Sequence, residues 1–199
     1  ITKTVDMEQK ELSDYLFDYL QLNFDETVLD IGSNDGSLLR YFKEKGLNAV
    51  GVEPTNIAKI ANSNGIFTIQ SFFNIDTVNQ VIKKMGKVKL ITSTNVFAHM
   101  STLGDVMEGI VQAIDDDGYY CFENHYIMEI LDKVQYDTFY HEHLRTYSLI
   151  SLIKLFEMYN LNLFHAQIVS RYGGSIRCLV SKKKIKQTEN LKKLLEIEK

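Results

Sequence analysis

The chain has 199 residues, of which 45% are hydrophobic and 24% are charged, and its formal net charge at pH 7 is −4. This length and composition predict one soluble globular domain with a full hydrophobic core. The mildly acidic balance argues against nucleic acid as a partner, and the dense lysine cluster at 182–184 indicates a solvated turn or strand end.

No apolar run approaches the length of a bilayer span, and the N-terminal residues lack the pattern of a signal sequence. We therefore expect a cytoplasmic protein that has no membrane partner. Cys121 and Cys178 are far apart and outside any C-x-x-C pair, which predicts neither a disulfide framework nor a cysteine zinc site. The sequence leaves the oligomeric state open.

Apolar spacing predicts an N-terminal helix at about residues 6–22 and then an alternation of strands and helices. The predicted strands lie at about 26–31, 48–53, 66–70, 88–94, 117–123, 161–170 and 175–182. The predicted helices that follow lie at about 36–46, 55–64, 75–84, 102–114, 126–133, 148–159 and 186–198. Alternation predicts a largely parallel sheet, whereas the short connection at 170–174 predicts a C-terminal antiparallel hairpin.

The expected fold is therefore α/β, with a Rossmann-like, seven-stranded, mostly parallel sheet and helices on both of its faces. We divide the chain into an N-terminal helix at 1–24, a main domain at 25–182 and a C-terminal helix at 183–199. The apolar side of that last helix needs cover, so we expect it to lead into a further domain beyond this sequence.

The most informative stretch runs from Val28 to Leu39, where a buried strand leads into a glycine turn and then a helix. Glycine lets the backbone approach a ligand closely, as it does in loops that hold nucleotide cofactors. The dinucleotide fingerprint needs a second glycine two residues after the first, and here Ser33 and Asn34 follow Gly32. A nicotinamide or flavin cofactor is therefore disfavoured.

The form D-x-G-x-x-x-G, followed by an acid after the next strand, resembles the class I S-adenosylmethionine-dependent methyltransferases. The acid lies about 20 residues beyond the first glycine, where it would meet the ribose hydroxyls. The proline that follows it would stop the strand at the rim of a cofactor site. The cofactor-binding residues predicted from this motif are Asp30, Gly32, Ser33, Asn34, Asp35, Gly36, Glu53 and Pro54.

Residues after the third and fourth strands are further cofactor candidates, because ligands of open α/β sheets bind beyond the carboxyl ends of strands. Phe72 or Phe73 could lie against an adenine ring, although both could equally be core residues. His99 could point to the reaction centre or only bind a loop carbonyl. With Asn95 and Val96, these residues complete the predicted cofactor site.

The densest chemistry of the chain is the run Tyr-His-Glu-His at 140–143. Two histidines and a glutamate suit metal ligation or acid/base catalysis, and a polar surface loop is the alternative without function. Metal ligation is disfavoured, because the i, i+4 spacing of a helical zinc site is absent. Tyr140, His141, Glu142 and His143 are therefore the candidate catalytic residues, without a metal ion, and the surface loop stays the alternative.

The chain resembles the sugar C-methyltransferases that act on nucleotide-linked 4-keto-6-deoxy sugars. The resemblance covers about residues 25–182, with the run at 140–143 as its most specific marker and Gly-Gly-Ser-Ile-Arg at 173–177 as a second. It implies S-adenosylmethionine as the cofactor and a small-molecule sugar as the acceptor, and we expect a nucleotide-activated or capsular sugar. It also implies that Tyr140, Glu142 and His143 lie at the acceptor, with His143 as the base.

The chemistry of such a reaction suits these residue types. A carbon next to a ketone becomes nucleophilic when a base removes its proton and the enolate oxygen is stabilised. Neutral His143 can take the proton, Tyr140 could donate a hydrogen bond to the oxyanion, and Glu142 could orient the histidine. Two alternatives stay open: an O-methyltransferase in which His143 deprotonates a hydroxyl, and a cofactor-binding scaffold without catalysis.

Overall fold

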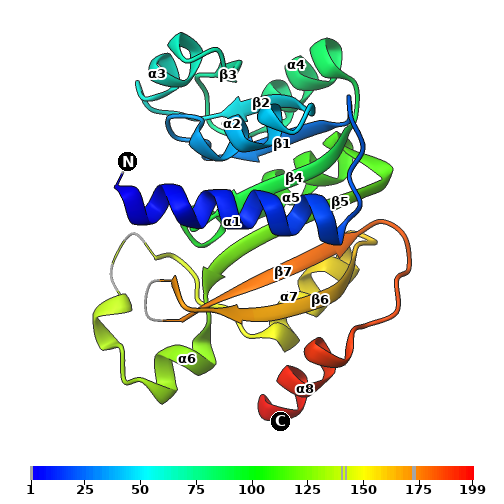
Figure 1. The fold of residues 1–199 in the computed structure, drawn as a ribbon. Coiled ribbons are helices and arrows are strands. Elements are labelled where there is room, and N and C mark those ends of the chain that lie inside the picture. Colours follow the sequence, from blue (N-terminus) through cyan, green and yellow to red (C-terminus); the bar gives the residue numbers. More distant parts are fainter. Residues whose placement is uncertain (1, 140, 142, 172–173) are drawn as a thin grey trace. The chain divides into compact units, whose positions relative to one another are not determined.

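The computed structural model describes residues 2–139, 141, 143–171 and 174–199, and Figure 1 traces its elements in chain order. The strands are β1 (Thr27–Ile31), β2 (Asn48–Val52), β3 (Thr68–Ile69), β4 (Val88–Thr94), β5 (Ile114–His125), β6 (Asn162–Val169) and β7 (Ser175–Ser181). The helices are α1 (Lys3–Tyr19), α2 (Ser37–Glu44), α3 (Ala58–Ser63), α4 (Ile75–Met85), α5 (Leu103–Ala113), α6 (Ile127–Asp132), α7 (Leu149–Met158) and α8 (Glu189–Ile197). Two 3₁₀ turns, η1 (Phe97–His99) and η2 (Tyr136–Thr138), complete the described elements.

The strands form one seven-stranded sheet in the order β3-β2-β1-β4-β5-β7-β6. β1 pairs in parallel with β2 and β4, and β2 pairs in parallel with β3. β7 runs antiparallel to both of its neighbours, β5 and β6. The predicted α/β fold with a C-terminal antiparallel hairpin is therefore confirmed.

The chain forms two compact units, Ile1–Thr92 and Ser93–Lys199. The boundaries expected near residues 24 and 182 stay predictions. No helix in the described part of the chain is long and apolar enough to span a membrane.

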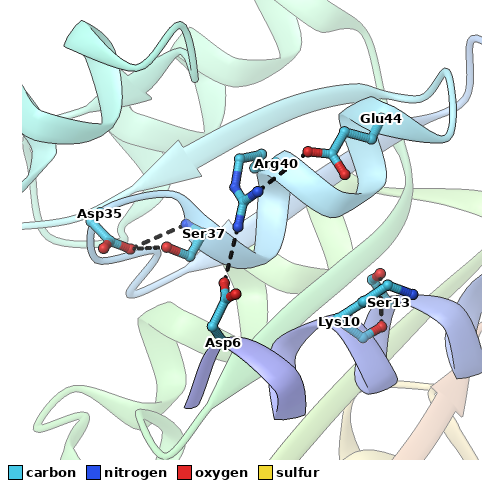
Figure 2. A network of polar contacts seen from close by, with 7 residues as sticks. All are labelled: Asp6, Lys10, Ser13, Asp35, Ser37, Arg40 and Glu44. Carbon is cyan, nitrogen blue, oxygen red and sulfur yellow. Dashed lines mark hydrogen bonds and ion pairs between the residues drawn. The ribbon is translucent and has the colours of Figure 1, made fainter. Parts of the chain in front are cut away.

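The first unit is built on β1, which is buried along its whole length. Its side chains Val28 and Leu29 are fully buried, as the apolar run in the sequence predicts. Helix α1 packs against α2, and Figure 2 shows Arg40 on α2 bonded to Asp6 on α1 and to Glu44. These ion pairs are exposed, so each contributes at most about 1 kcal/mol to stability.

The second unit has an aromatic core. Phe97 of η1 lies against four rings, with centroid separations of 5.2 to 6.2 Å. These rings belong to Tyr120, Phe122, Tyr147 and Phe156. The Tyr120 hydroxyl is buried 2.7 Å from Ser93 Oγ, so its polar end has a partner inside the core. This packing fixes η1 and its last residue, His99.

Two predicted strands differ in length from the observed ones. β3 has two residues instead of the expected five, and Asn62 binds both backbone groups of Thr68, the N–H at 3.1 Å and the carbonyl at 2.8 Å. β5 is longer than expected, because the predicted gap after α5 does not exist. Ala113 ends α5, and Ile114 both caps that helix and begins β5.

Candidate active site

The glycine motif forms a tight loop after β1, in the first unit. Gly32, Asn34 and Gly36 have positive φ angles of 74°, 52° and 79°, in the left-handed region that favours glycine and tolerates asparagine. The N–H groups of Gly32 and Ser33 both donate to the Val52 carbonyl, at 2.8 and 3.2 Å. The loop therefore closes around the end of β2, which brings it to the predicted acid.

Glu53 stands directly after β2 and is 7% exposed. Its Oε2 accepts from the Asn34 N–H at 3.2 Å, and its Oε1 accepts from the Thr55 N–H at 2.9 Å. An ionised carboxylate oxygen can accept about two hydrogen bonds, so each oxygen can accept one more from a ribose hydroxyl. The acid and the glycine loop predicted from the sequence are thus in contact.

Ser33 and Gly51 make this cradle fit a ligand. The Ser33 hydroxyl is buried without a hydrogen-bond partner among the described residues, so it is available to a group that enters the loop. A Cβ on Gly51 would lie 2.3 Å from Ser33 Oγ and 2.7 Å from Thr68 Oγ1. Only glycine therefore leaves Ser33 in its position.

Asp30 is a buried acid at the same loop, 3% exposed, with Oδ1 accepting from the Thr92 hydroxyl at 2.7 Å. Burial raises the pKa of Asp30 to about 7, the bond from Thr92 opposes that rise, and the charge of Glu53 adds to it. This loop therefore has two carboxyl groups, those of Asp30 and Glu53. They suit a cofactor that carries ribose hydroxyls and a sulfonium charge.

The other cofactor candidates of the first unit have mixed surroundings. Figure 2 shows Asp35 bonded to Ser37, whose N–H and hydroxyl donate to Oδ1 at 3.2 and 2.6 Å, so this carboxylate caps the start of α2. Phe73 is 8% exposed and belongs to the core, whereas Phe72 is 75% exposed. Of the two phenylalanines, only Phe72 presents its ring to solvent. Pro54 is half-buried next to Glu53.

In the second unit, the predicted residues after β4 lie beside the end of β5. Asn95 has a φ of 55°, and its N–H donates to the Glu123 carbonyl at 2.8 Å. Asn95 Oδ1 is buried with no partner in the part of the chain that the structure describes. The N–H of His99 donates to the Val96 carbonyl at 2.9 Å, which closes the η1 turn.

Three imidazoles gather in this unit. The ring of His143 has its centroid 4.8 Å from that of His99 and 4.7 Å from that of His125. Arg145 donates to the carbonyl of Met100 and, at 3.3 Å, to that of Ser101. These bonds join the segment after His143 to the segment after His99. The structure therefore joins His99 and His143, which the sequence assigned to different tasks.

His125 lies beside His143 but was not among the predicted site residues, although it is one of the three histidines between positions 125 and 143. It is half-buried at the end of β5. Burial lowers its pKa from the ordinary value, and His143 and His99 lower it further. His125 therefore favours the neutral form beside His143.

The remaining predicted catalytic residues divide into two groups. Tyr140 and Glu142 lie outside the described residues. His141 is exposed, whereas His143 is half-buried. Across the described ranges, no group of three or more histidine, cysteine, aspartate or glutamate side chains could hold a metal ion.

A buried ionic cluster at the end of β5 is a second feature that the sequence did not predict. Glu123 is fully buried and accepts from Arg177 Nε at 2.6 Å and from an Arg171 guanidinium nitrogen at 2.9 Å. Glu123 and Arg177 are opposite each other in the β5–β7 register. A charged residue inside an apolar strand was the available signal, since buried charges are paired.

The sequence of this chain is similar to those of known methyltransferases. The methyltransferase-domain family matches residues 7–166. The chain is 32% identical to the C-methyltransferase NovU of Streptomyces niveus over 168 residues, which are 84% of this chain and 40% of that protein. The chain thus spans about two fifths of the length of this relative.

Solved structures with low sequence identity share the fold. An S-adenosylmethionine-dependent methyltransferase from Clostridium acetobutylicum has a TM-score of 0.68 at 17% identity, covering 88% of this chain and 92% of its own. Magnesium protoporphyrin IX methyltransferase from Synechocystis, solved with bound SAH, has a TM-score of 0.65 at 12% identity, with 89% and 83% covered. With the glycine loop, Glu53 and the sheet order, the match shows that the chain belongs to the methyltransferase-domain family, as a class I S-adenosylmethionine-dependent methyltransferase domain.

Proposed function

We propose that this chain methylates a carbon next to a keto group of a nucleotide-linked sugar, with His143 as the base. The observation that carries the proposal is the position of His143 between His99 and His125, with its Nδ1 2.7 Å from the Thr138 carbonyl. The similarity to a named C-methyltransferase supports carbon as the atom that receives the methyl group.

The contact with Thr138 supports one tautomer of His143. A carbonyl oxygen can only accept a hydrogen bond, so Nδ1 carries the proton in this geometry. In the neutral ring Nε2 then has a lone pair and can take a proton from the acceptor. A base that removes a carbon-bound proton needs such an oriented nitrogen.

The proposed cofactor site lies on the glycine loop. Glu53 would bind the ribose hydroxyls, Ser33 would offer its buried hydroxyl, and Asp30 would face the cofactor as an acid below the loop. S-adenosylmethionine bound there supplies an electrophilic methyl group. Because positioning supplies much of the catalysis of such a transfer, the protein need only hold the acceptor carbon in line.

Other roles follow from the resemblance and stay proposals. Tyr140 would donate a hydrogen bond to the enolate oxygen, and Glu142 would orient the catalytic imidazole. His141, which is exposed, would contribute to the surroundings of the acceptor. We also propose a small-molecule sugar as the acceptor and the cytoplasm as the place of action.

Solvent deuterium exchange tests the proposal. A nucleotide-linked 4-keto-6-deoxy sugar is incubated in D₂O with the wild type and with His143→Asn, with S-adenosylhomocysteine present to fill the cofactor site. We expect exchange at the carbon next to the ketone with the wild type and a loss of at least about a hundredfold with the variant. Calorimetry with S-adenosylmethionine should give the same affinity for both proteins.

Two outcomes would overturn the assignment. No exchange at carbon, together with a product methylated on a hydroxyl when S-adenosylmethionine replaces S-adenosylhomocysteine, would make the chain an O-methyltransferase. Exchange at an undiminished rate in His143→Asn would remove His143 as the base.

A further inference from the structure

Residues 127–146, which include α6, η2 and His143, connect β5 to α7 and are called the 127–146 loop below. Tyr126 and Tyr147 form a parallel β-bridge, and the Ile127 N–H donates to the Tyr147 carbonyl at 3.2 Å. Tyr126 is 1% exposed and Tyr147 is 7% exposed. The two ends of the loop thus meet inside the second unit.

One carboxylate binds both sides of this closure. Glu198 Oε1 accepts from the Tyr126 hydroxyl at 2.7 Å and from the Leu149 N–H at 2.5 Å, and Oε2 accepts from the Ile150 N–H at 2.9 Å. Burial, together with the hydrogen bond to Glu198, raises the pKa of Tyr126, so this phenol keeps the proton that it donates. Glu198 therefore ties Tyr126, the residue that precedes the loop, to the helix that follows the loop.

The start of α7 needs this acceptor. The first N–H groups of a helix have no partner within the helix, and here the Ser148 side chain accepts only from the Ser151 N–H. The N–H groups of Leu149 and Ile150 are satisfied by Glu198 instead. A carboxylate at this position also interacts favourably with the helix dipole.

Glu198 directly follows α8 as its C-terminal cap, and this helix is itself fixed. Leu191 is fully buried and Leu194 is 8% exposed. Asn190 Nδ2 donates to the Ala166 carbonyl of β6 at 2.7 Å, and the Thr188 N–H donates to the Phe164 carbonyl at 2.9 Å. Glu198 therefore reaches the loop from an element that is anchored on β6.

We propose that Glu198 is a positioning residue for methyl transfer, which holds the base of the 127–146 loop and so sets the place of His143. The inference rests on the proposed function of His143 as the base. Glu198 lies far from the catalytic run in sequence and belongs to none of the motifs of the chain. It acts through Tyr126 and α7, without touching the acceptor.

A series of variants tests the proposal. Glu198→Ala removes all three hydrogen bonds, Glu198→Gln places an amide N–H against one of the backbone donors, and Tyr126→Phe removes only the phenol bond. Glu196→Ala is the matched control, because it removes an exposed carboxylate from the same helix. Each protein is measured for amide hydrogen exchange, acceptor kinetics and affinity for S-adenosylmethionine.

We expect faster amide exchange in peptides of the 127–146 loop, by about fivefold in Tyr126→Phe and by more in Glu198→Ala. Peptides from the glycine loop at 28–39 should exchange as in the wild type. The kcat of Glu198→Ala should fall by about tenfold to a hundredfold, while its affinity for S-adenosylmethionine stays within about twofold. Glu196→Ala should match the wild type in every measurement.

The readouts separate this proposal from the one on which it rests. Unchanged exchange of the loop in both Glu198→Ala and Tyr126→Phe would overturn the role of Glu198, even if His143 proved to be the base. Faster exchange with an unchanged kcat would leave Glu198 a structural residue and also overturn the proposal. If His143→Asn stays active, the base assignment fails, whereas the exchange data still report on the closure. Should Glu198→Ala fail to fold, Tyr126→Phe and Glu198→Gln carry the test.

Discussion

Replacing Gly51 by alanine probes the contact between β2 and the glycine loop. The added Cβ would lie 2.3 Å from Ser33 Oγ, 2.7 Å from Thr68 Oγ1 and 2.9 Å from Ser33 Cβ. Separations this short force Ser33 to move. Two of the three contacts are with its Oγ and Cβ, and this short, buried side chain cannot turn away without a shift of its backbone. Since Ser33 belongs to the loop that binds Glu53, the shift should reach the cofactor site.

The size of the effect follows from two opposing terms. Overpacking in a tight interior destabilises the fold by about 1–3 kcal/mol. Replacing glycine by alanine stabilises it by about 0.4–1 kcal/mol, because the unfolded chain has less conformational entropy. We expect Gly51→Ala to lower the free energy of unfolding by about 1–2 kcal/mol. For a chain of this size, that change lowers the Tm by about 2–8 °C.

Thermal unfolding and calorimetry measure the outcome. Gly104→Ala is the matched control, because its Cβ would lie 3.7 Å from the Tyr159 hydroxyl and meet nothing closer. It should be as stable as the wild type or more stable by up to about 1 kcal/mol. Adding Ser33→Ala to Gly51→Ala should recover part of the loss, with a coupling of about 0.5–2 kcal/mol. A Gly51→Ala protein that melts and binds S-adenosylmethionine like the wild type would refute the reasoning.

Two further substitutions test buried charges. Asp30, whose pKa burial raises to about 7, binds its proton more tightly in the folded than in the unfolded chain, so this group makes the protein less stable as the pH rises from about 4 to about 7. Asp30→Asn should therefore gain stability over the wild type at pH 8 but not at pH 4, and an equal Tm difference at both values would count against this. Glu123→Ala removes the carboxylate that binds Arg171 and Arg177 and should cost about 3–5 kcal/mol in urea unfolding. Glu123→Gln, which keeps one acceptor oxygen, should cost less, and equal losses would contradict the role of the ion pairs.

The sequence pattern predicted most of the fold, most directly at β1, whose five residues are all buried. Val28 to Ile31 is apolar apart from Asp30, and that exception is a buried acid at the cofactor loop. The glycine loop and Glu53 were predictable together, since both depend on local geometry after neighbouring strands. The antiparallel pairing of β6 with β7 was also predictable, because a short connection indicated the hairpin, whereas that connection carried no information on the pairing of β7 with β5.

Contacts between distant segments were not predictable. The grouping of His99, His125 and His143 requires η1, the end of β5 and the segment before α7 to meet, and periodicity carries no information on that meeting. Phe72 and Phe73 have the same chemistry, and only the tertiary structure decides which is buried. The role of Asp35 at the cofactor stays a prediction, and its side chain also accepts from Ser37 at the start of α2, a local bond that the sequence Asp-Gly-Ser could have indicated.

The junction of α5 and β5 limits how this chain can vary. Ala113 is the last helical residue and Ile114 the first of the strand, so no spare residue separates them. One inserted residue would either form a bulge or exchange the two faces of β5, which would carry Glu123 away from Arg177. Length changes among natural relatives, and any engineered tag or graft, should therefore avoid this junction.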